Sequence, residues 1–264
     1  MSGSGLTGKR LVIIGGTSGM GLSAALACIR EGAQVVVTGR NEDTAAAAVS
    51  QLKENGKVAI ADASEEDAAE TAIKICVESF GGFDGIYHVA GGSGRKYGDG
   101  PLHELTKDGW EQTLNLNLTS LMLSNRAAVR YFLEHKQAGA ILNMGSVLGF
   151  SPSPKYFTTH AYAAAKSAVI GFTKSIAAHY APNNIRVNVI APALVETPMS
   201  RRAATDETIV QFIKNKQPLD GGRMGIPEDT DGLAVFLLSD QAKFITGQVI
   251  SVDGGWSITE GQYQ

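Results

Sequence analysis

A glycine-rich turn between an apolar strand and a helix constrains the fold of this chain more than any other feature. Four apolar residues, 11–14, run directly into Gly15-Gly16-Thr17-Ser18-Gly19-Met20-Gly21, and a helix rich in small residues is predicted over 22–30. Glycine permits the positive φ angles and close backbone contacts that such a turn requires. A strand, a tight turn and a helix in this order are typical of a unit that crosses over to a parallel strand.

The same turn predicts a phosphate-binding site. Backbone N–H groups of the turn and the N-terminus of the following helix can hold a pyrophosphate. The spacing is Gly-x-x-x-Gly-x-Gly, which differs from the Gly-x-Gly-x-x-Gly fingerprint. A turn that binds nothing is the alternative, because turns use glycine without any ligand. We favour phosphate binding, with contacts expected from Gly15, Thr17, Ser18, Gly19, Met20 and Gly21.

Strands and helices are predicted to alternate along the rest of the chain. The further strands are expected at 34–38, 58–61, 83–89, 140–144, 185–190 and 248–252, and the helices at 41–54, 68–80, 110–131, 162–180, 207–216 and 229–238. This alternation predicts a three-layer, doubly wound parallel α/β sheet of Rossmann type, with about seven strands and helices on both faces. The length of 264 residues fits a single domain, 1–264, in which the long irregular segment 191–225 is expected to act as a substrate lid.

Composition argues against several classes of protein. Hydrophobic residues make up 44% and charged residues 19% of the chain, which indicates a folded α/β protein rather than a disordered one. A net charge of -3 provides no basic field, so nucleic acid is not an expected partner. The sequence contains no apolar signal segment and no run of about 18 apolar residues, so we expect a cytoplasmic protein without a membrane partner. Cys28 and Cys76 fall in apolar helical patterns, which indicates core thiols and neither a disulfide nor a metal site.

Residues that follow the second, third and fourth strands are candidate cofactor contacts. Arg40 stands where an acidic residue would bind the ribose hydroxyls of NAD, and it has no obvious acidic neighbour. A guanidinium there suits a 2′-phosphate, so NADP(H) is favoured over NAD(H), with a solvated arginine as the alternative. Asp62, beside Ala63, either contacts the adenine edge or caps its turn. The turn at Ala90 and Gly91 would let the backbone approach a ligand closely.

Tyr162 and Lys166 lie four positions apart in a predicted helix, so both project from the same face. A tyrosine that exchanges protons near neutral pH needs its pKa lowered from about 10, and a nearby ammonium can lower it. Ser146 ends the fifth strand, where its hydroxyl could donate to a carbonyl or alkoxide oxygen. By spacing alone, a solvated Tyr–Lys pair is the alternative. Asn117, inside a long predicted helix, either organises polar groups or faces solvent.

With these residues in place, the chain resembles the short-chain dehydrogenase/reductase family along nearly its whole length. The turn at 14–21 is similar to the family's Thr-Gly-x-x-x-Gly-x-Gly, Tyr162 and Lys166 to its Tyr-x-x-x-Lys, Ser146 to its serine, and Asn117 to its helix asparagine. Several matches in the same order make chance an unlikely explanation.

Further matches and some departures lie outside these motifs. Segments 245–248 and 252–255 resemble the family's last strand and its flanks. Ile14, His88 and Ala193 stand where the family has threonine, asparagine and glycine. These positions mostly brace the central strands, so we expect the departures to affect fine geometry more than chemistry.

The resemblance implies an oxidoreductase that transfers a hydride between NADP(H) and a small-molecule carbonyl or secondary alcohol. In the family mechanism Tyr162 gives or takes the proton of the substrate oxygen, and Ser146 holds that oxygen. Lys166 lowers the pKa of the phenol and binds the nicotinamide ribose, and Asn117 positions a water molecule. With NADP(H), reduction of a ketone is the expected direction.

The resemblance leaves the substrate open among 3-oxoacyl thioesters, sugars or polyols, and cyclic ketones. Val195 and Thr197 lie in a segment that resembles the one holding the nicotinamide carboxamide. Residues 151–155 are extra length between the serine and the tyrosine, and we expect this loop to shape the substrate pocket. Arg201 and Arg202 near the lid are expected to be solvated rather than to bind an anionic group.

Two other kinds of protein share part of this pattern, and the resemblance also implies an oligomeric state. A sugar-nucleotide epimerase or dehydratase shares the glycine turn and the Tyr-x-x-x-Lys, but needs a larger substrate region than 191–225. A non-catalytic dinucleotide-sensing protein would not need the serine, tyrosine, lysine and asparagine together. The resemblance implies a homotetramer, in which the helices at 110–131 and 162–180 and the edge strand at 248–252 would be covered. A dimer would also cover them.

Overall fold

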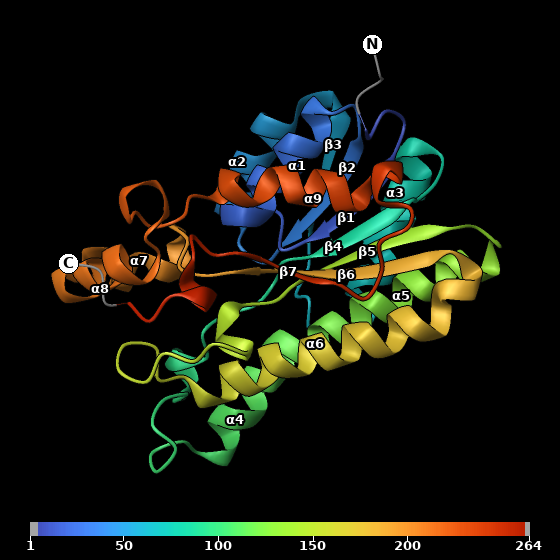
Figure 1. Ribbon diagram of the computed structural model, residues 1–264. Helices are drawn as coiled ribbons and strands as arrows, with labels where there is room; N and C mark the ends of the chain where they lie inside the picture. The colour runs from blue at the N-terminus through green and yellow to red at the C-terminus, as the bar shows by residue number, and fades with distance from the viewer. Residues whose placement is uncertain (1–4, 262–264) are drawn as a thin grey trace.

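A seven-stranded parallel sheet forms the centre of the computed structural model, which describes residues 5–261 (Figure 1). The strand order is β3-β2-β1-β4-β5-β6-β7. The strands are β1 (Arg10–Ile14), β2 (Gln34–Gly39), β3 (Gly56–Ile60), β4 (Gly85–His88), β5 (Gly139–Met144), β6 (Ile185–Pro192) and β7 (Val249–Val252). The order reverses between β1 and β4, and a ligand crevice is expected beyond the carboxyl ends of the strands at such a point.

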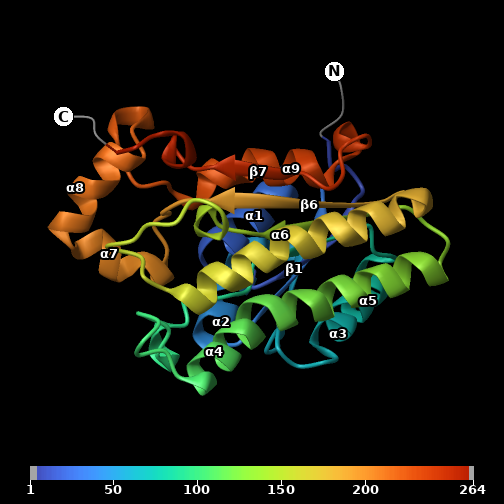
Figure 2. The same cartoon turned by 60° about the horizontal axis from the view of Figure 1, so that its bottom comes forward.

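Helices cover both faces of this sheet (Figures 1 and 2). One layer contains α1 (Gly19–Arg30), α2 (Glu42–Leu52) and α9 (Asp231–Leu238), and the other contains α3 (Ala68–Phe80), α5 (Ser120–Glu134) and α6 (His160–Tyr180), with α4 (Lys107–Leu114) preceding α5. The three-layer, doubly wound α/β fold predicted from the alternation of strands and helices is therefore confirmed.

The central strands are apolar throughout because each of their faces is covered by helices. In β1, Leu11 and Ile13 belong to the core cluster beneath α1 and α9, whereas Val12 and Ile14 belong to the cluster beneath α3 and α5. All four side chains are at most 1% exposed. This burial fixes the register of β1 and so the position of the glycine turn that follows it.

The long helix predicted at 110–131 is present but is not a regular α-helix. A π-helical segment, Asn115–Thr119, joins α4 to α5. One wider turn of this kind often lies at a functional site, because it re-aims the side chains beside it. Sequence periodicity missed it, since one inserted residue leaves the apolar pattern on either side intact.

The expected lid, 191–225, is more ordered than its sequence suggested. Its first residues extend β6 to Pro192, and α7 (Arg201–Thr205) and α8 (Glu207–Lys216) follow. Both helices lie beyond the ends to which β6 and β7 point (Figure 2). A β-bridge between Val195 and Gly225 joins the two ends of this segment.

Two predictions from composition can be compared with the described residues. Cys28 and Cys76 are buried free thiols, as expected, and burial raises the pKa of each to about 12. Within residues 5–261, no helix combines the length and the apolar character needed to cross a membrane.

Candidate active site

Two adjoining pockets open at the carboxyl ends of the strands. We call them the glycine-turn pocket, of about 320 Å³, and the tyrosine pocket, of about 230 Å³. Both are lined by Met20, Val89, Gly91, Thr197 and Met199. The shared lining makes the two pockets one continuous cleft, long enough in principle for an elongated ligand.

Most of the predicted cofactor contacts line the glycine-turn pocket. They are Gly15, Thr17, Ser18, Gly19, Met20, Arg40, Asp62, Ala63, Ala90, Gly91 and Thr197. Val195, Tyr162 and Lys166 line the tyrosine pocket instead. Gly21 lines neither, because it packs beneath the turn, where a Cβ would lie 2.2 Å from the carbonyl oxygen of Gly15.

The glycine turn has the features that a pyrophosphate would need. Gly15 and Gly19 have φ angles of 82° and 53°, and a Cβ on Gly15 would lie 2.6 Å from the backbone nitrogen of Ala90. At the start of α1, the Ser18 side chain makes no capping hydrogen bond and the first turn holds no acidic residue. The positive end of this helix is therefore not compensated by its own side chains, and the site fits a dinucleotide.

Arg40 is less free than the sequence suggested. Its Nη1 donates to Oδ2 of Asp62 at 3.2 Å, so the expectation that it has no acidic neighbour was wrong. The two residues are 22 positions apart in sequence, and the parallel pairing of β2 with β3 brings their strand ends together. Any anion that binds Arg40 must therefore compete with a carboxylate.

Asp62 holds its own turn as well as the arginine. Its Oδ1 accepts hydrogen bonds from the N–H and the hydroxyl of Ser64, at 2.9 and 2.7 Å. Burial alone would raise the pKa of Asp62, but the hydrogen bonds from Ser64 and Arg40 outweigh it and lower that pKa. The sequence left two roles open for Asp62, contact with the adenine edge and capping of its turn, and the structure shows the capping.

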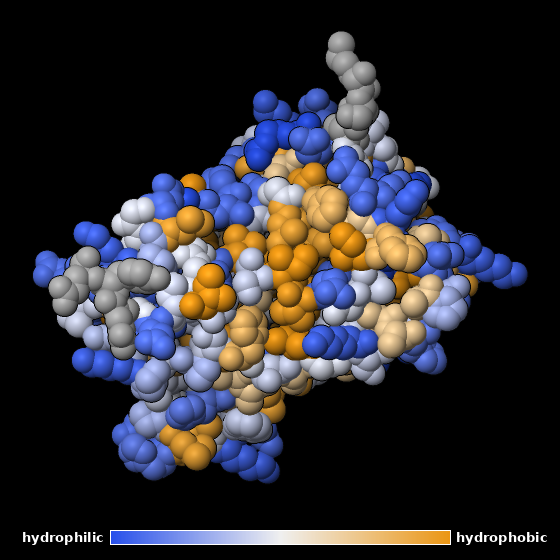
Figure 3. All heavy atoms as spheres, viewed as in Figure 1, coloured by the Kyte–Doolittle hydropathy of each residue, from blue (hydrophilic) through white to orange (hydrophobic). Residues whose placement is uncertain are grey.

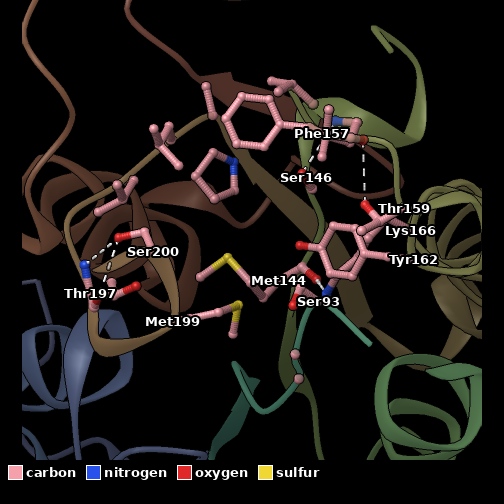
Figure 4. Close-up of a pocket in the computed structure, with 18 of the residues that line it drawn as sticks. Ser93, Met144, Ser146, Phe157, Thr159, Tyr162, Lys166, Thr197, Met199 and Ser200 are labelled. Atoms are coloured by element: carbon pink, nitrogen blue, oxygen red, sulfur yellow. Dashed lines mark hydrogen bonds between the residues drawn. The ribbon is translucent and has the colours of Figure 1, made fainter. Parts of the chain in front are cut away.

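Tyr162, Lys166, Ser146 and Asn117 all line the tyrosine pocket, three of them visible in Figure 4. Ser146 follows β5 directly, and its Oγ accepts the N–H of Leu148 at 3.2 Å. Its hydroxyl lies close enough to that of Tyr162 to lower the pKa of the phenol. The two hydroxyls therefore share one small region, as their places at the end of β5 and the start of α6 led us to expect.

Asp99 fixes the beginning of α6. Its carboxylate is 3% exposed and accepts the N–H groups of Ala161 and Tyr162 at 3.0 and 2.9 Å. A carboxylate in this position satisfies N–H groups that have no partner inside the helix and favours its positive end. The sequence analysis missed this residue, because it comes from a loop 63 positions before the tyrosine it orients.

The pKa of Tyr162 is raised, not lowered. Burial is the main cause of this rise in pKa, and the nearby Ser146 hydroxyl opposes it. The ammonium nitrogen of Lys166 lies 5.5 Å from the centre of the Tyr162 ring, yet it donates to the carbonyl oxygen of Met144 at 2.8 Å. Burial lowers the pKa of Lys166 to about 8. The phenol is therefore protonated at neutral pH, and the lysine is close to its titration point.

Asn117 is fully buried, so the solvent-facing alternative was wrong. Its Oδ1 accepts the N–H of Gly92 at 3.0 Å, and its Nδ2 donates to the Gly92 and Thr113 carbonyls at 2.8 and 2.9 Å. These bonds tie the π-helical segment to the turn that follows β4. The side chain thus organises backbone groups at the border of the two pockets.

His88 replaces a family asparagine at the end of β4 and stays inside the protein. It is 1% exposed, and its Nδ1 lies 2.7 Å from the Ser124 hydroxyl of α5. Burial and, secondarily, the charge of Lys166 lower the pKa of His88 to about 3. A neutral imidazole that braces β4 against α5 agrees with the expected bracing role of this position.

Aromatic residues that the sequence analysis did not single out form one wall of the tyrosine pocket. Phe157 packs edge-on against Trp256, with ring centres 5.8 Å apart. The indole nitrogen of Trp256 donates to the carbonyl of Ser151 at 3.2 Å. The loop 151–155 therefore does not line the pocket itself, but it holds the tryptophan that does.

Among residues 5–261, no group of three or more His, Cys, Asp or Glu side chains is placed to hold a metal ion. Beside Tyr162 the cleft offers hydroxyl groups, the Lys166 ammonium and backbone N–H groups, and farther along it are the guanidinium groups of Arg40, Arg95 and Arg202. Such groups can exchange a proton with an oxygen atom and hold that atom in place.

Known proteins are similar to this chain in both sequence and structure. A family model described as Enoyl-(Acyl carrier protein) reductase matches residues 14–257. The 3beta-hydroxysteroid dehydrogenase 2 of Eggerthella lenta is 34% identical over 267 residues, covering 96% of each chain. A short-chain type dehydrogenase/reductase from Mycobacterium ulcerans matches with a TM-score of 0.87 and 30% identity, over 96% of this chain and 91% of that one. The 3-ketoacyl-(acyl-carrier-protein) reductase from Brucella melitensis, complexed with NADH, matches with a TM-score of 0.83 and 28% identity, over 96% of this chain and 100% of that one. The chain is thus an oxidoreductase that acts on CH–OH or C=O groups, and it belongs to the short-chain dehydrogenase/reductase family.

Proposed function

We propose that this protein is a ketone reductase that uses NADP(H) and in which Tyr162 is the proton donor. The observation that carries the proposal is that the hydroxyl side chains of Tyr162 and Ser146 both line the tyrosine pocket, which adjoins the glycine-turn pocket. A bound nicotinamide would supply the hydride. The protein must then hold the substrate oxygen and deliver one proton to it.

The roles of the two hydroxyls follow from their surroundings. Ser146 accepts one hydrogen bond from the backbone, which leaves its own proton free to orient a carbonyl oxygen. Tyr162 has a raised pKa and so carries its proton at neutral pH. A phenol that is protonated, and lies beside the oxygen on which negative charge develops, acts as a general acid. Reduction of a carbonyl group is the direction that this protonation state favours.

Lys166 and Asn117 support this proton transfer. The ammonium of Lys166 lies near the phenol and stabilises the phenolate that remains after the proton has left. We propose that it also binds the nicotinamide ribose. The amide of Asn117 hydrogen-bonds to the backbone of Gly92 and so fixes the pocket lining beside the phenol. We propose that a water molecule bound near Asn117 continues the proton path.

The cofactor proposal rests on the glycine-turn pocket. The uncompensated end of α1 would take the pyrophosphate, and Arg40 at the rim would take a 2′-phosphate. Thr197 lines both pockets and Val195 the tyrosine pocket, a place that suits the nicotinamide carboxamide. Because Asp62 pairs with Arg40, we propose a preference for NADP(H) over NAD(H) rather than exclusive use of it.

We further propose that residues 1–264 act as one domain in which 191–225 is a substrate lid. The bridge between Val195 and Gly225 closes the base of the lid. Above it, Ala203, Ile209 and Ile213 pack with Val147 and Trp256 in a small separate hydrophobic cluster. A segment with a narrow base, packed on the rest of the chain through a small separate cluster, can move over the pocket without disturbing the sheet.

We also propose a homotetramer that works in the cytoplasm. Figure 3 shows an apolar band over β7 and α9, and β7 is an edge strand of the sheet. On α6, small residues face solvent: Ser167, Ala168, Gly171, Ser175 and Ala178. Two different exposed surfaces of this kind suit two sets of two-fold contacts. The two free thiols suit a reducing compartment.

A spectrophotometric screen tests the main proposal. NADPH oxidation would be followed with a panel of 3-oxoacyl thioesters, keto sugars and cyclic ketones. Turnover of at least one class is expected. A dinucleotide-sensing protein would bind NADPH without turnover of any ketone, and an epimerase or dehydratase would convert a sugar nucleotide without net NADPH oxidation; either result would overturn the proposal.

A further inference from the structure

Two arginines meet at the rim of the tyrosine pocket. Arg95 lies in the loop after β4, and Arg202 lies in α7 of the proposed lid. Both line the pocket, and the Nη2 atom of each lies 3.4 Å from the same acceptor, the backbone carbonyl oxygen of Tyr156. The two guanidinium groups are therefore within hydrogen-bonding reach of a single small group.

Neither of these arginines has an acidic partner among the described residues. Six other arginines form ion pairs within 4.0 Å: Arg10, Arg30, Arg40, Arg126, Arg130 and Arg223. Arg186 donates to two backbone carbonyls, and Arg201 forms no such ion pair with the described residues and lies outside the pocket. Within residues 5–261, no ion pair of this kind includes Arg95 or Arg202. Two positive charges that share one neutral carbonyl oxygen leave most of their donors without a partner, and no ion pair neutralises either charge.

Asp99, the acidic residue whose charge acts on Arg95, already accepts two other hydrogen bonds. Asp99 attracts Arg95 through space, but its two oxygens accept the N–H groups of Ala161 and Tyr162. Burial is the first cause of a lowered pKa at Arg95, and the charge of Arg202 is the second. The pair is thus held together against its own repulsion, a situation that an anion between the two groups would relieve.

We propose that Arg95 and Arg202 bind an oxyanion of the substrate, such as a carboxylate, sulfonate or phosphate. The inference rests on the proposed reductase function, because it places the anion at one end of a pocket whose other end holds Tyr162 and Ser146. Guanidinium forks match the geometry of such groups. Arg202 is exposed, as the sequence led us to expect, but it also lines the pocket, whereas its neighbour Arg201 does not.

The rest of the pocket defines the middle of the substrate. Apolar side chains dominate the lining away from the arginines: Val147, Leu148, Phe157, Leu194, Met199 and Trp256. A fully charged or highly hydroxylated chain would lose hydration there without new partners. The substrate class that fits is therefore an oxo compound with an apolar linker and a terminal anionic group.

A binding experiment tests the anion site independently of turnover. Hexanoate and its neutral counterpart hexanamide would be titrated calorimetrically into the NADPH-bound protein. Hexanoate is expected to bind about tenfold more tightly, the size of one exposed charge-assisted interaction. Arg95→Gln and Arg202→Gln should each remove most of this preference. Lys96→Gln and Arg201→Gln are matched controls, because each removes an adjacent positive charge outside the pocket, and both should keep it.

Turnover then separates this proposal from the one on which it rests. The ratio of kcat/KM for 5-oxohexanoate over 5-oxohexanamide should fall about tenfold in Arg202→Gln and stay constant in Arg201→Gln. Reduction of both compounds at equal efficiency by the wild type would overturn the anion site and leave the reductase intact. Preference for hexanoate without reduction of any ketone would support the anion site and overturn the reductase. Equal loss in Arg202→Gln and Arg201→Gln would show general electrostatic attraction and overturn the specific pair.

Discussion

Lys166 lies beside Tyr162 but does not hydrogen-bond to it: the ammonium nitrogen is 5.5 Å from the ring centre and donates to the Met144 carbonyl. The carbonyl belongs to the last residue of β5, so the lysine links α6 to the sheet. Its charge can still stabilise a phenolate across this distance, because the pocket is buried and poorly screened. The pair therefore combines a structural bond with an electrostatic role.

Removal of the phenol hydroxyl should abolish the chemistry and spare binding. Tyr162→Phe is expected to lower kcat for ketone reduction by a factor of about 100 or more, the scale of a lost general acid. The ring remains, so the dissociation constant for NADPH, measured by fluorescence titration, should stay within a few-fold of wild type. Turnover close to that of the wild type in this variant would contradict the proposed mechanism.

The charge on Lys166 should determine the pH above which kcat/KM for reduction falls. Its pKa is lowered to about 8, so raising the pH through that value removes the positive charge that stabilises the phenolate. We expect kcat/KM for reduction to fall as the pH rises above about 8. Lys166→Arg keeps its charge throughout this range and should move this fall to higher pH. A fall at the same pH in Lys166→Arg would assign the titration to another group.

Asn117 should contribute to stability as well as to the shape of the site. Asn117→Ala leaves the N–H of Gly92 and two carbonyl groups without their present partners in a buried region. We expect a loss of about 2 kcal/mol in the free energy of unfolding, measured by urea denaturation, together with weaker activity. Asn55→Ala, at an exposed asparagine, is the control and should change little. Equal small losses in both variants would contradict the bracing role.

The sequence was sufficient for the fold, because alternating apolar segments of suitable length leave few arrangements for a parallel sheet. It also placed Ser146, Tyr162 and Lys166 together, as their shared pocket shows, since positions at a strand end and on one helix face follow from local periodicity. It could not supply relations between distant residues. The pairing of Arg40 with Asp62 depends on the register of β2 against β3. The meeting of Arg95 with Arg202 depends on how the segment 191–225 folds back.

Asn117 and Tyr162 show a second limit of sequence reasoning. A π-helical turn leaves no mark in an apolar pattern, so the burial of Asn117 was not predictable from its neighbours. For Tyr162, the spacing to Lys166 indicated a lowered pKa, whereas burial dominates and raises it. Desolvation depends on everything packed around a group, and sequence spacing reports only one partner.

Arg40 should set the cofactor preference. We expect Arg40→Ala to lower kcat/KM with NADPH by about tenfold and to leave the value with NADH almost unchanged, since only NADPH has the 2′-phosphate. Asp62→Asn should increase the preference for NADPH, because it removes the competing charge and keeps an acceptor for Ser64. Arg126→Ala breaks another ion pair, outside the cleft, and serves as the control. A wild-type preference for NADH would refute the proposal.

Assembly should depend on the apolar band over β7. The Phe244 side chain, which precedes this strand, is fully exposed, and Val249, Ile250 and Val252 of the strand are only partly buried by the chain itself. An exposed apolar edge of this kind is unfavourable in a monomer and is expected to meet its two-fold copy. We predict that sedimentation equilibrium at micromolar concentration gives a tetramer for the wild type and a dimer for Phe244→Glu, in which the surface on α6 still associates. Val49→Glu places the same charge on an exposed apolar position of α2 and should leave the tetramer intact. A monomeric wild type would refute the interfaces, and a dimeric wild type would refute only the number of subunits.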